Sequence, residues 1–169
     1  MRRVLARECW DLRSRVLRPG LPLSECQWPC DSMAETFHLG CFLEGRIVGI
    51  ATFHPEGLPA DLLSRDSKSK RNSDSVPALV PGFTPSASSH SFRLRGMAVD
   101  PDIHRMGIGR RLIVEGESVL RSLGADLLWF NARENAFSFY SSLGYEFVTE
   151  MFDIPGVGPH KVMLKKLIF

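Results

Sequence analysis

The spacing of hydrophobic and polar residues divides the chain into helical and extended segments. Hydrophobic residues recur with the period of a helix from about Ala6 to Leu17 and again from Leu112 to Leu123. Pro19–Gly20 is typical of the end of the first helix, and Gly124 of the cap that ends the second. A further helix is expected from about Glu134 to Leu143.

The remaining hydrophobic segments have the composition of β-strands. We expect strands over Arg2–Leu5, Thr36–Phe42, Ile47–Phe53, Phe92–Val99, Ala125–Asn131, Tyr145–Phe152 and Lys161–Ile168. Residues 43–46 read Leu-Glu-Gly-Arg, which predicts a hairpin between the second and third of these strands. Residues 127–130 are continuously apolar, as expected for a strand covered on both faces. Strands flanked by helices in this order predict α/β packing.

A polar segment separates the third strand from the fourth. Residues 56–91 are rich in Ser, Pro, Lys, Asp and Asn, and such a composition cannot bury enough surface to offset the entropy of ordering. We expect an insertion that loops out of the sheet as unstructured surface chain. The alternative is a regulatory or partner-binding tether that is phosphorylated on its serines.

Composition favours a single domain of ordinary globular type. The chain has 169 residues, of which 44% are hydrophobic and 24% charged, and its net charge of +2 argues against partners such as nucleic acid or an anionic membrane. Its apolar runs are far shorter than the about 20 residues that span a bilayer. The arginines near residue 1 resemble a transit peptide, but Glu8 and Asp11 argue against one.

The cysteines do not have the spacing of metal ligands. Cys26 and Cys30 are separated by three residues without a matching second pair, and Cys9 and Cys41 stand alone. We interpret all of them as small buried side chains in a reducing compartment. The sequence therefore predicts a cytoplasmic protein that binds no metal.

A glycine-rich turn opens the second helix. The segment His104, Arg105, Met106, Gly107, Ile108, Gly109 and Arg110 precedes the helical pattern. The first backbone N–H groups of a helix have no intrahelical partner, and Arg105, Arg110 and Arg111 add positive charge, so the turn favours a phosphate. It lacks the Lys and Ser or Thr of a P-loop, and Leu112 stands where a dinucleotide-binding turn needs its third glycine.

Two further patterns surround this turn. Val99, Asp100 and Pro101 precede it, and Ala136, Phe139, Tyr140, Leu143, Gly144 and Tyr145 follow the apolar strand. In this order and spacing the segments resemble the GNAT superfamily of acyl-CoA-dependent N-acetyltransferases, including bacterial members of unassigned substrate, over roughly residues 30–169. His104, Met106 and Arg133 depart from the residue types common at these positions in the family.

The resemblance implies one N-acetyltransferase domain over residues 1–169. Its fold would be α/β, or α+β by some schemes, with a central mixed, mostly antiparallel twisted sheet of six to seven strands flanked by helices and splayed between strands four and five. Acetyl-CoA would lie in that wedge. The implied cofactor contacts are Met97, Ala98, Val99, the turn from His104 to Arg110, Asn131 and Tyr140.

The resemblance also suggests roles in catalysis. Tyr140 matches the general acid that protonates the leaving thiolate, although an aromatic side chain at this position could serve packing alone. His38 and His160 are candidates for the base that deprotonates the amine, because imidazole titrates near neutral pH. Asp100, Glu134 or ordered water are alternatives. Arg18 and Arg95 are candidates either for binding a substrate carboxylate or for plain exposure to solvent.

The resemblance implies transfer of an acetyl group from acetyl-CoA to a primary amine by direct attack in a ternary complex. A small-molecule amine is favoured over a protein, because the chain has no long acidic run that would bind a polycation. Edge strands of the sheet are candidate sites for homodimer pairing. Two alternatives stay open: an acyl-CoA sensor without catalysis, and an interaction protein that works through its Ser-rich insertion.

Overall fold

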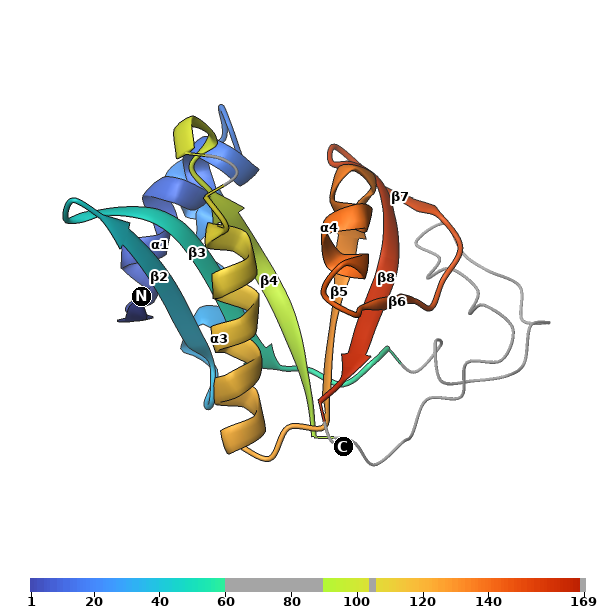
Figure 1. Ribbon diagram of the computed structural model, residues 1–169. Coiled ribbons are helices and arrows are strands. Elements are labelled where there is room, and N and C mark those ends of the chain that lie inside the picture. Colours follow the sequence, from blue (N-terminus) through green and yellow to red (C-terminus); the bar gives the residue numbers. More distant parts are fainter. Residues whose placement is uncertain (60–89, 104–105, 168–169) are drawn as a thin grey trace.

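A single twisted sheet carries helices on both of its faces in the computed structural model, which describes residues 1–59, 90–103 and 106–167 (Figure 1). The strands are β1 (Arg2–Val4), β2 (Phe37–Leu43), β3 (Arg46–Pro55), β4 (Ser91–Val99), β5 (Leu127–Arg133), β6 (Glu146–Phe147), β7 (Phe152–Ile154) and β8 (Gly158–Lys166). Their order is β1-β2-β3-β4-β5-β8-β6, and β7 also pairs with β8. Among these pairs only β4 and β5 are parallel, so the predicted mixed, mostly antiparallel sheet is confirmed.

The two longer helices cover opposite faces of the sheet. α3 (Ile108–Ser122) packs on the face that carries the main core, and α1 (Ala6–Leu12) packs on the other. α1 continues as a π-helical turn, η1 (Arg13–Leu17), in which the Arg18 N–H donates to the Arg13 carbonyl. The shorter helical segments are η2 (Leu23–Cys26), η3 (Pro29–Ser32), η4 (Pro101–Ile103), η5 (Glu134–Ala136) and α4 (Phe137–Ser141).

The C-terminal strands differ from the prediction in one respect. The segment expected as one strand over Tyr145–Phe152 forms β6 and β7, so the described sheet has eight strands instead of six to seven. The Val162 N–H donates to the Thr149 hydroxyl at 2.9 Å, and a side chain thus takes a place in the ladder where the strand breaks. β8 begins at Gly158, earlier than predicted, which brings His160 into the sheet.

The start of the predicted insertion is packed against the sheet. Leu58 is buried with Trp129 and Val148, and the Trp129 indole N–H donates to the Glu56 carbonyl at 2.8 Å. The prediction that the insertion loops away from residue 56 onward is therefore wrong for its first residues, because apolar and hydrogen-bonding partners hold them. Residues 60–89 lie outside the described residues.

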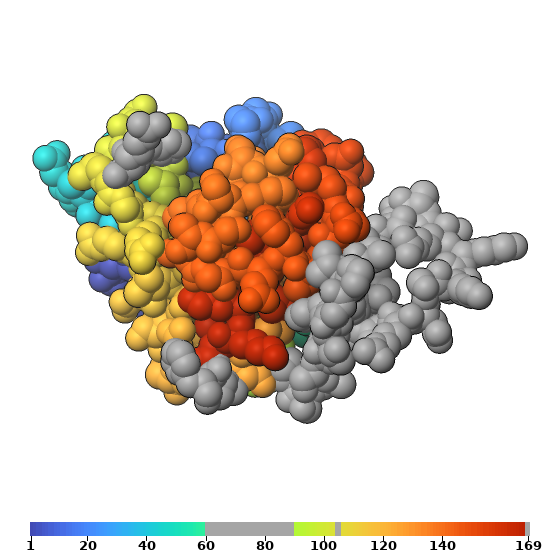
Figure 2. Space-filling view, turned by 45° about the vertical axis from the view of Figure 1, so that its right-hand side comes forward, coloured from blue at the N-terminus to red at the C-terminus, as the bar shows by residue number. Residues whose placement is uncertain are grey.

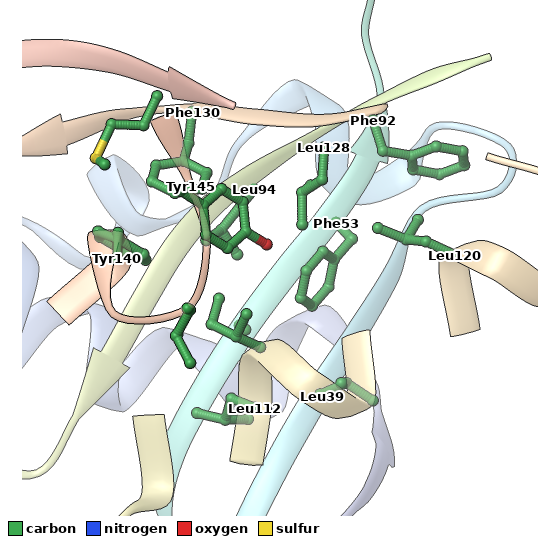
Figure 3. Close-up of a cluster of buried hydrophobic side chains, with 14 of the residues drawn as sticks. Leu39, Phe53, Phe92, Leu94, Leu112, Leu120, Leu128, Phe130, Tyr140 and Tyr145 are labelled. Atoms are coloured by element: carbon green, nitrogen blue, oxygen red, sulfur yellow. The ribbon is translucent and has the colours of Figure 1, made fainter. Parts of the chain in front are cut away.

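The main core fills the space between the sheet, α3 and α4 (Figure 3). Phe53 of β3 stacks on Phe37 of β2 with ring centroids 4.9 Å apart, and Leu112 and Leu120 of α3 are fully buried beside them. Gly116 of α3 lies directly over the Phe53 ring, where no side chain fits. This close approach fixes how near α3 lies to the sheet.

A larger residue at Gly116 is expected to destabilise the fold. Gly116→Val would press a side chain into the buried Phe53 ring, and overpacking of a core costs about 1–3 kcal/mol. Gly57→Val is the control, because a Cβ there meets no atom within 4 Å, and its effect should stay within about 0.5 kcal/mol. Urea unfolding measures both, and equal stabilities of the two variants would contradict the packing described.

β4 and β5 separate along their length. They pair only from Ser91 to Arg93 on β4, and farther along the two strands diverge (Figure 1). The cause lies in β4, where a register shift against β3 surrounds Gly96, whose positive φ of 63° is typical of a bulged, bent strand. The predicted splay between strands four and five is thus present, and it opens the sheet toward the end where η1 and the β7–β8 turn lie.

Candidate active site

A cavity of about 520 Å³ occupies the opening between β4 and β5. Its wall is built from the end of η1 with Arg18, from Trp28, and from parts of β4 and β5. The segment from Asn135 to Tyr140 and the β7–β8 region complete it. The space-filling view shows the N-terminal helices and the residues around the β7–β8 turn next to each other at one end of the molecule (Figure 2). A volume of this size suits a small ligand. Segments distant in the sequence therefore converge on one site.

The cavity has two chemically different sides because the side chains of β4 alternate between the faces of the sheet. Leu94 belongs to the core beneath α3, whereas Arg93 lies over the ring of Trp129 and Arg95 over that of Trp28. The side toward α3 and α4 is consequently apolar and aromatic. The opposite side carries arginines.

The first turn of α3 adjoins the apolar side. Gly107 caps the helix with a φ of 70°, and a Cβ there would meet no atom within 4 Å among the described residues. A Cβ on Gly109 would lie 3.0 Å from Met97, which lines the cavity. Arg110 and Met106 are exposed, Ile108 is buried in the core, and His104 and Arg105 lie outside the described residues. The helix thus directs unpaired N–H groups and positive charge to the end of the opening.

Tyr140 lines the cavity from α4. Its ring lies against Phe130, 4.3 Å between centroids, and its hydroxyl points toward Met97 Sδ at 3.7 Å. Burial raises the pKa of Tyr140, so the hydroxyl keeps its proton at neutral pH. Thioether sulfur is a weak acceptor, and the proton is therefore available to a better one.

His160 faces the cavity from β8. The side chain is buried, and its Nδ1 lies 2.7 Å from the Gly158 carbonyl oxygen. A carbonyl can only accept, so Nδ1 carries the hydrogen and Nε2 keeps its lone pair in the neutral ring. In this tautomer Nε2 is the ring nitrogen that can accept a proton.

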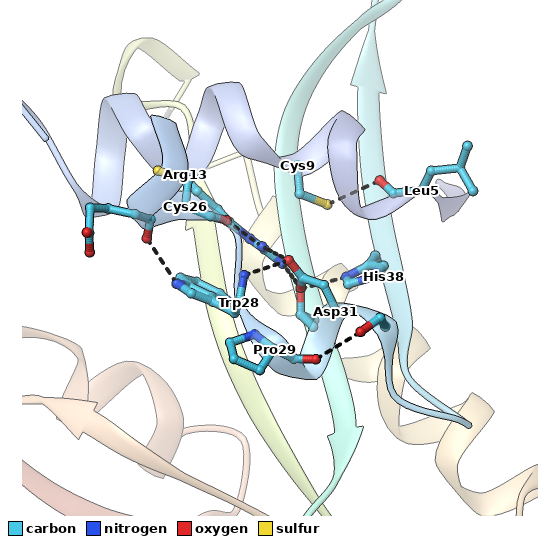
Figure 4. A network of polar contacts seen from close by, with 11 residues as sticks. Leu5, Cys9, Arg13, Cys26, Trp28, Pro29, Asp31 and His38 are labelled. Atoms are coloured by element: carbon cyan, nitrogen blue, oxygen red, sulfur yellow. Dashed lines mark hydrogen bonds and ion pairs between the residues drawn. The ribbon is translucent and has the colours of Figure 1, made fainter. Parts of the chain in front are cut away.

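His38 does not reach the cavity. Its Nδ1 lies 2.9 Å from the Thr52 hydroxyl, within a buried network that includes Arg13 and Asp31 (Figure 4). Burial lowers the pKa of His38, which keeps the ring neutral. A strand pattern cannot distinguish such a structural histidine from one that faces a ligand.

The two acidic alternatives for the base are also placed away from the cavity lining. Asp100 is buried and accepts from the Asp102 N–H and from Arg15, with Arg46 at 3.9 Å. The backbone hydrogen bond first, and then Arg15, lower the pKa of Asp100, which makes it a weak base. Glu134 is exposed at the start of η5.

Some of the other predicted site residues line the cavity and others do not. Asn131, Arg18 and Arg95 line the cavity, whereas Ala98 packs into the small core beneath α1. Ala98 and Val99 of β4 pair with β3 on one edge, Met97 lies in the register shift before them, and β5 has already diverged from the other edge. That free edge supplies hydrogen-bonding groups to the opening.

Sequence reasoning missed several residues of the lining, among them Trp28 and Arg93. Trp28 lies in an irregular segment between η2 and η3, where no periodicity marks a position as facing a site. Arg93 stands in a strand and could have been found from its alternation with Leu94.

Comparison with known proteins identifies the family. The model of the acetyltransferase (GNAT) family matches residues 4–145. The chain belongs to the GNAT family. It is 32% identical over 160 residues to an uncharacterised N-acetyltransferase, YitI, of Bacillus subtilis (strain 168), covering 95% of this chain and 91% of that protein. The family predicted from the sequence motifs is thereby confirmed, and the chain is an N-acetyltransferase of the GNAT type.

Solved GNAT structures share the fold. An aminoglycoside 6'-N-acetyltransferase complexed with coenzyme A superposes with a TM-score of 0.64 at 14% identity, covering 97% of this chain and 91% of that one. The ribosomal-protein-S18-alanine N-acetyltransferase of Escherichia coli gives a TM-score of 0.61 at 16% identity, with 97% and 88% covered. GNAT enzymes use acetyl-CoA, which makes this compound the expected cosubstrate.

The described part of the chain contains neither a metal-binding cluster nor a membrane-spanning helix. Its His, Cys, Asp and Glu side chains form no group of three or more that could hold a metal ion. Among the described helices, none is long and apolar enough to cross a membrane. Cys9, Cys26, Cys30 and Cys41 are all buried free thiols, in line with their interpretation as packing residues.

Proposed function

We propose that this GNAT enzyme moves an acetyl group from acetyl-CoA to a primary amine that is bound in the cavity between β4 and β5. The amine nitrogen forms a bond to the acetyl carbon and the carbon–sulfur bond breaks, while the nitrogen loses a proton and the sulfur gains one. One observation carries the proposal: Met97 lies beside Gly109 in the first turn of α3 and its sulfur faces the Tyr140 hydroxyl, so an anion site and a proton donor meet at the same opening.

The chain offers a binding surface that fits acetyl-CoA, which would supply the thioester. The N–H groups of the first turn of α3 suit a pyrophosphate, and Arg110 adds charge. The free edge of β4 from Met97 to Val99 suits the amide groups of a pantetheine arm and can polarise a carbonyl. Asn131 lies across the opening from that edge.

Two side chains are assigned to proton transfer. Tyr140 donates its hydroxyl proton to the departing sulfur, which its raised pKa keeps available. His160, with Nε2 unprotonated, accepts a proton from the amine directly or through water. His38 takes no part in this proposal, because its ring is bonded to Thr52 away from the cavity.

Amine-dependent release of CoA thiol tests the proposal. Purified protein is incubated with acetyl-CoA and individual primary amines, and the free thiol is measured together with the mass of the acetylated product. Saturable release that requires an amine would support the proposal. Micromolar binding of acetyl-CoA with no release for any amine would instead identify an acyl-CoA sensor.

Removal of the Tyr140 hydroxyl is expected to slow the chemical step. Tyr140→Phe should lower kcat by about 10- to 100-fold, at the low end for acid catalysis because a thiol of pKa about 8.5 needs little assistance, while the KM for acetyl-CoA stays unchanged. Tyr145→Phe is the matched control, since its hydroxyl donates to Glu117 within the core. Steady-state kinetics of both variants measure the effect. Equal kcat values for Tyr140→Phe and the wild type would show that the Tyr140 hydroxyl takes no part in the mechanism.

A further inference from the structure

The side of the cavity opposite α3 is cationic. Four arginines line the cavity, Arg18, Arg93, Arg95 and Arg133, and no Asp or Glu belongs to the lining as far as the chain is described. A cavity with this charge repels a polycationic amine and attracts an anion. The charge distribution therefore carries information about the acceptor.

Arg95, unlike Arg93, has no acidic partner among the described residues. Arg93 is held by Glu56, with Nη1 2.7 Å from Oε1, and lies over the Trp129 ring at 4.6 Å. Arg95 is half-buried, and no carboxylate of the described residues lies within ion-pair distance of its guanidinium. Burial first and the neighbouring Arg93 second lower the pKa of Arg95, as expected for a half-buried cation beside another cation.

Arg95 is also held in position. Its guanidinium lies over the Trp28 ring, 5.1 Å from the centroid, and Trp28 itself sits where a side chain on Gly96 would be. The Trp28 indole N–H donates to the Glu25 carbonyl at 3.2 Å, and Arg13 lies over the same ring at 3.9 Å. A flat guanidinium supported by a fixed aromatic ring is preorganised to bind a carboxylate through two N–H groups.

The phosphates of acetyl-CoA do not account for this arginine. The anion-binding turn at Gly107 lies at the N-terminus of α3, on the face of the sheet toward which Leu94 points. Arg95, next to Leu94 in the same strand, lies on the other face with Trp28 and Arg18. The two anion-attracting regions therefore belong to different ligands.

We infer that the acceptor is a small primary amine that carries a carboxylate, of the amino-acid type, with the carboxylate bound by Arg95 and Arg18 and the amine directed toward His160. This inference rests on the proposed transferase function and narrows its substrate. It separates this enzyme from the structurally similar aminoglycoside 6'-N-acetyltransferase, whose name specifies another kind of acceptor. The cavity of about 520 Å³ accommodates an acceptor of this size.

The test compares amino acids with their carboxamides, which keep the amine and lose the negative charge. CoA release is measured for each pair, with spermidine and an aminoglycoside as polycationic amines. The acids should be acetylated with a kcat/KM at least about 10-fold above that of their amides, as one charge-assisted contact provides. Equal or better use of the amides, or a preference for the polycations, would overturn the inference while leaving the transferase function standing.

Substitution of Arg95 tests whether this residue causes the preference for acids over amides. Arg95→Gln should lower kcat/KM for the acids by about 10- to 100-fold, leave the amides and the KM for acetyl-CoA unchanged, and recover partly in Arg95→Lys. Arg7→Gln, at an exposed arginine of α1, is the control. An equal loss for acids and amides in Arg95→Gln would contradict a carboxylate contact. No CoA release from any amine would overturn the proposed function, and the inference with it.

Discussion

Replacement of Arg13 by Met is expected to lower the free energy of unfolding by about 3–5 kcal/mol, because it leaves the mostly buried Asp31 carboxylate without its partner. The Arg13 side chain is 0% exposed. Its two terminal nitrogens lie 2.7 and 2.8 Å from the two oxygens of Asp31, and they also donate to the Cys26 carbonyl and the Thr52 hydroxyl (Figure 4). Met retains most of the volume and none of these donors.

Denaturant unfolding measures this loss, with Arg7→Met as the control at an exposed position of α1. The control should change stability by less than about 0.5 kcal/mol. A loss below about 1 kcal/mol in Arg13→Met would contradict the account, since it would place the Asp31 carboxylate in contact with water. Because Arg13 also supports Trp28 beneath Arg95, the variant should weaken the use of carboxylate-bearing acceptors as well.

The Arg13–Asp31 pair also predicts that acid changes the stability of the wild type and of Arg13→Met in opposite directions. Burial is the largest single influence and raises the pKa of Asp31, but the hydrogen bonds from Arg13 and from the Trp28 N–H, together with the charge of Arg13, outweigh it and hold the pKa below its ordinary value of 3.8. The stability from Asp31 is thus present above pH 3.8 and is lost as the pH falls through the lower folded-state pKa. In Arg13→Met, burial raises the Asp31 pKa, so lowering the pH from 7 toward 5 should narrow the difference from the wild type.

Charge reversal at the first turn of α3 is expected to weaken acetyl-CoA binding by about 10- to 100-fold. Arg110→Glu replaces a cation next to the unpaired N–H groups with an anion, and charge-assisted contacts to phosphate are each worth about 1.5–3 kcal/mol. Arg110 is exposed and its side chain takes no part in the core, so the stability of the protein should not change.

Calorimetric titration with acetyl-CoA at low ionic strength measures the effect, and added salt should reduce it. Arg7→Glu makes the same change of charge at a distant exposed site and serves as the control. If both variants weaken binding equally, the effect belongs to the net charge of the protein, and the turn at Gly107 is not the pyrophosphate site.

The sequence predicted those parts of the fold whose pattern is local. The helix after Gly107 and the strand around Trp129 follow from periodicity and from a continuous apolar run, and the splay follows from the family that the motifs indicate. The break between β6 and β7 could not be predicted, because it depends on the Thr149 hydroxyl replacing a backbone acceptor. Hydrophobic patterning carries no signal for such an exchange.

The candidate site was predictable where a motif marks the residue. Tyr140 and the turn at Gly107 were found in this way, and both meet Met97 at the opening. Trp28 was missed because it lies in irregular chain, and His38 was interpreted as a candidate base because only tertiary contacts reveal its bond to Thr52. Side chains that act through distant partners are not visible in local sequence.

A crystal structure of the protein grown with acetyl-CoA tests the central claim most directly. The account predicts a pyrophosphate bound by the N–H groups of Gly107, Ile108 and Gly109, a pantetheine arm along the free edge of β4, and the sulfur within hydrogen-bonding distance of the Tyr140 hydroxyl. Coenzyme A bound anywhere outside the opening between β4 and β5 would contradict it.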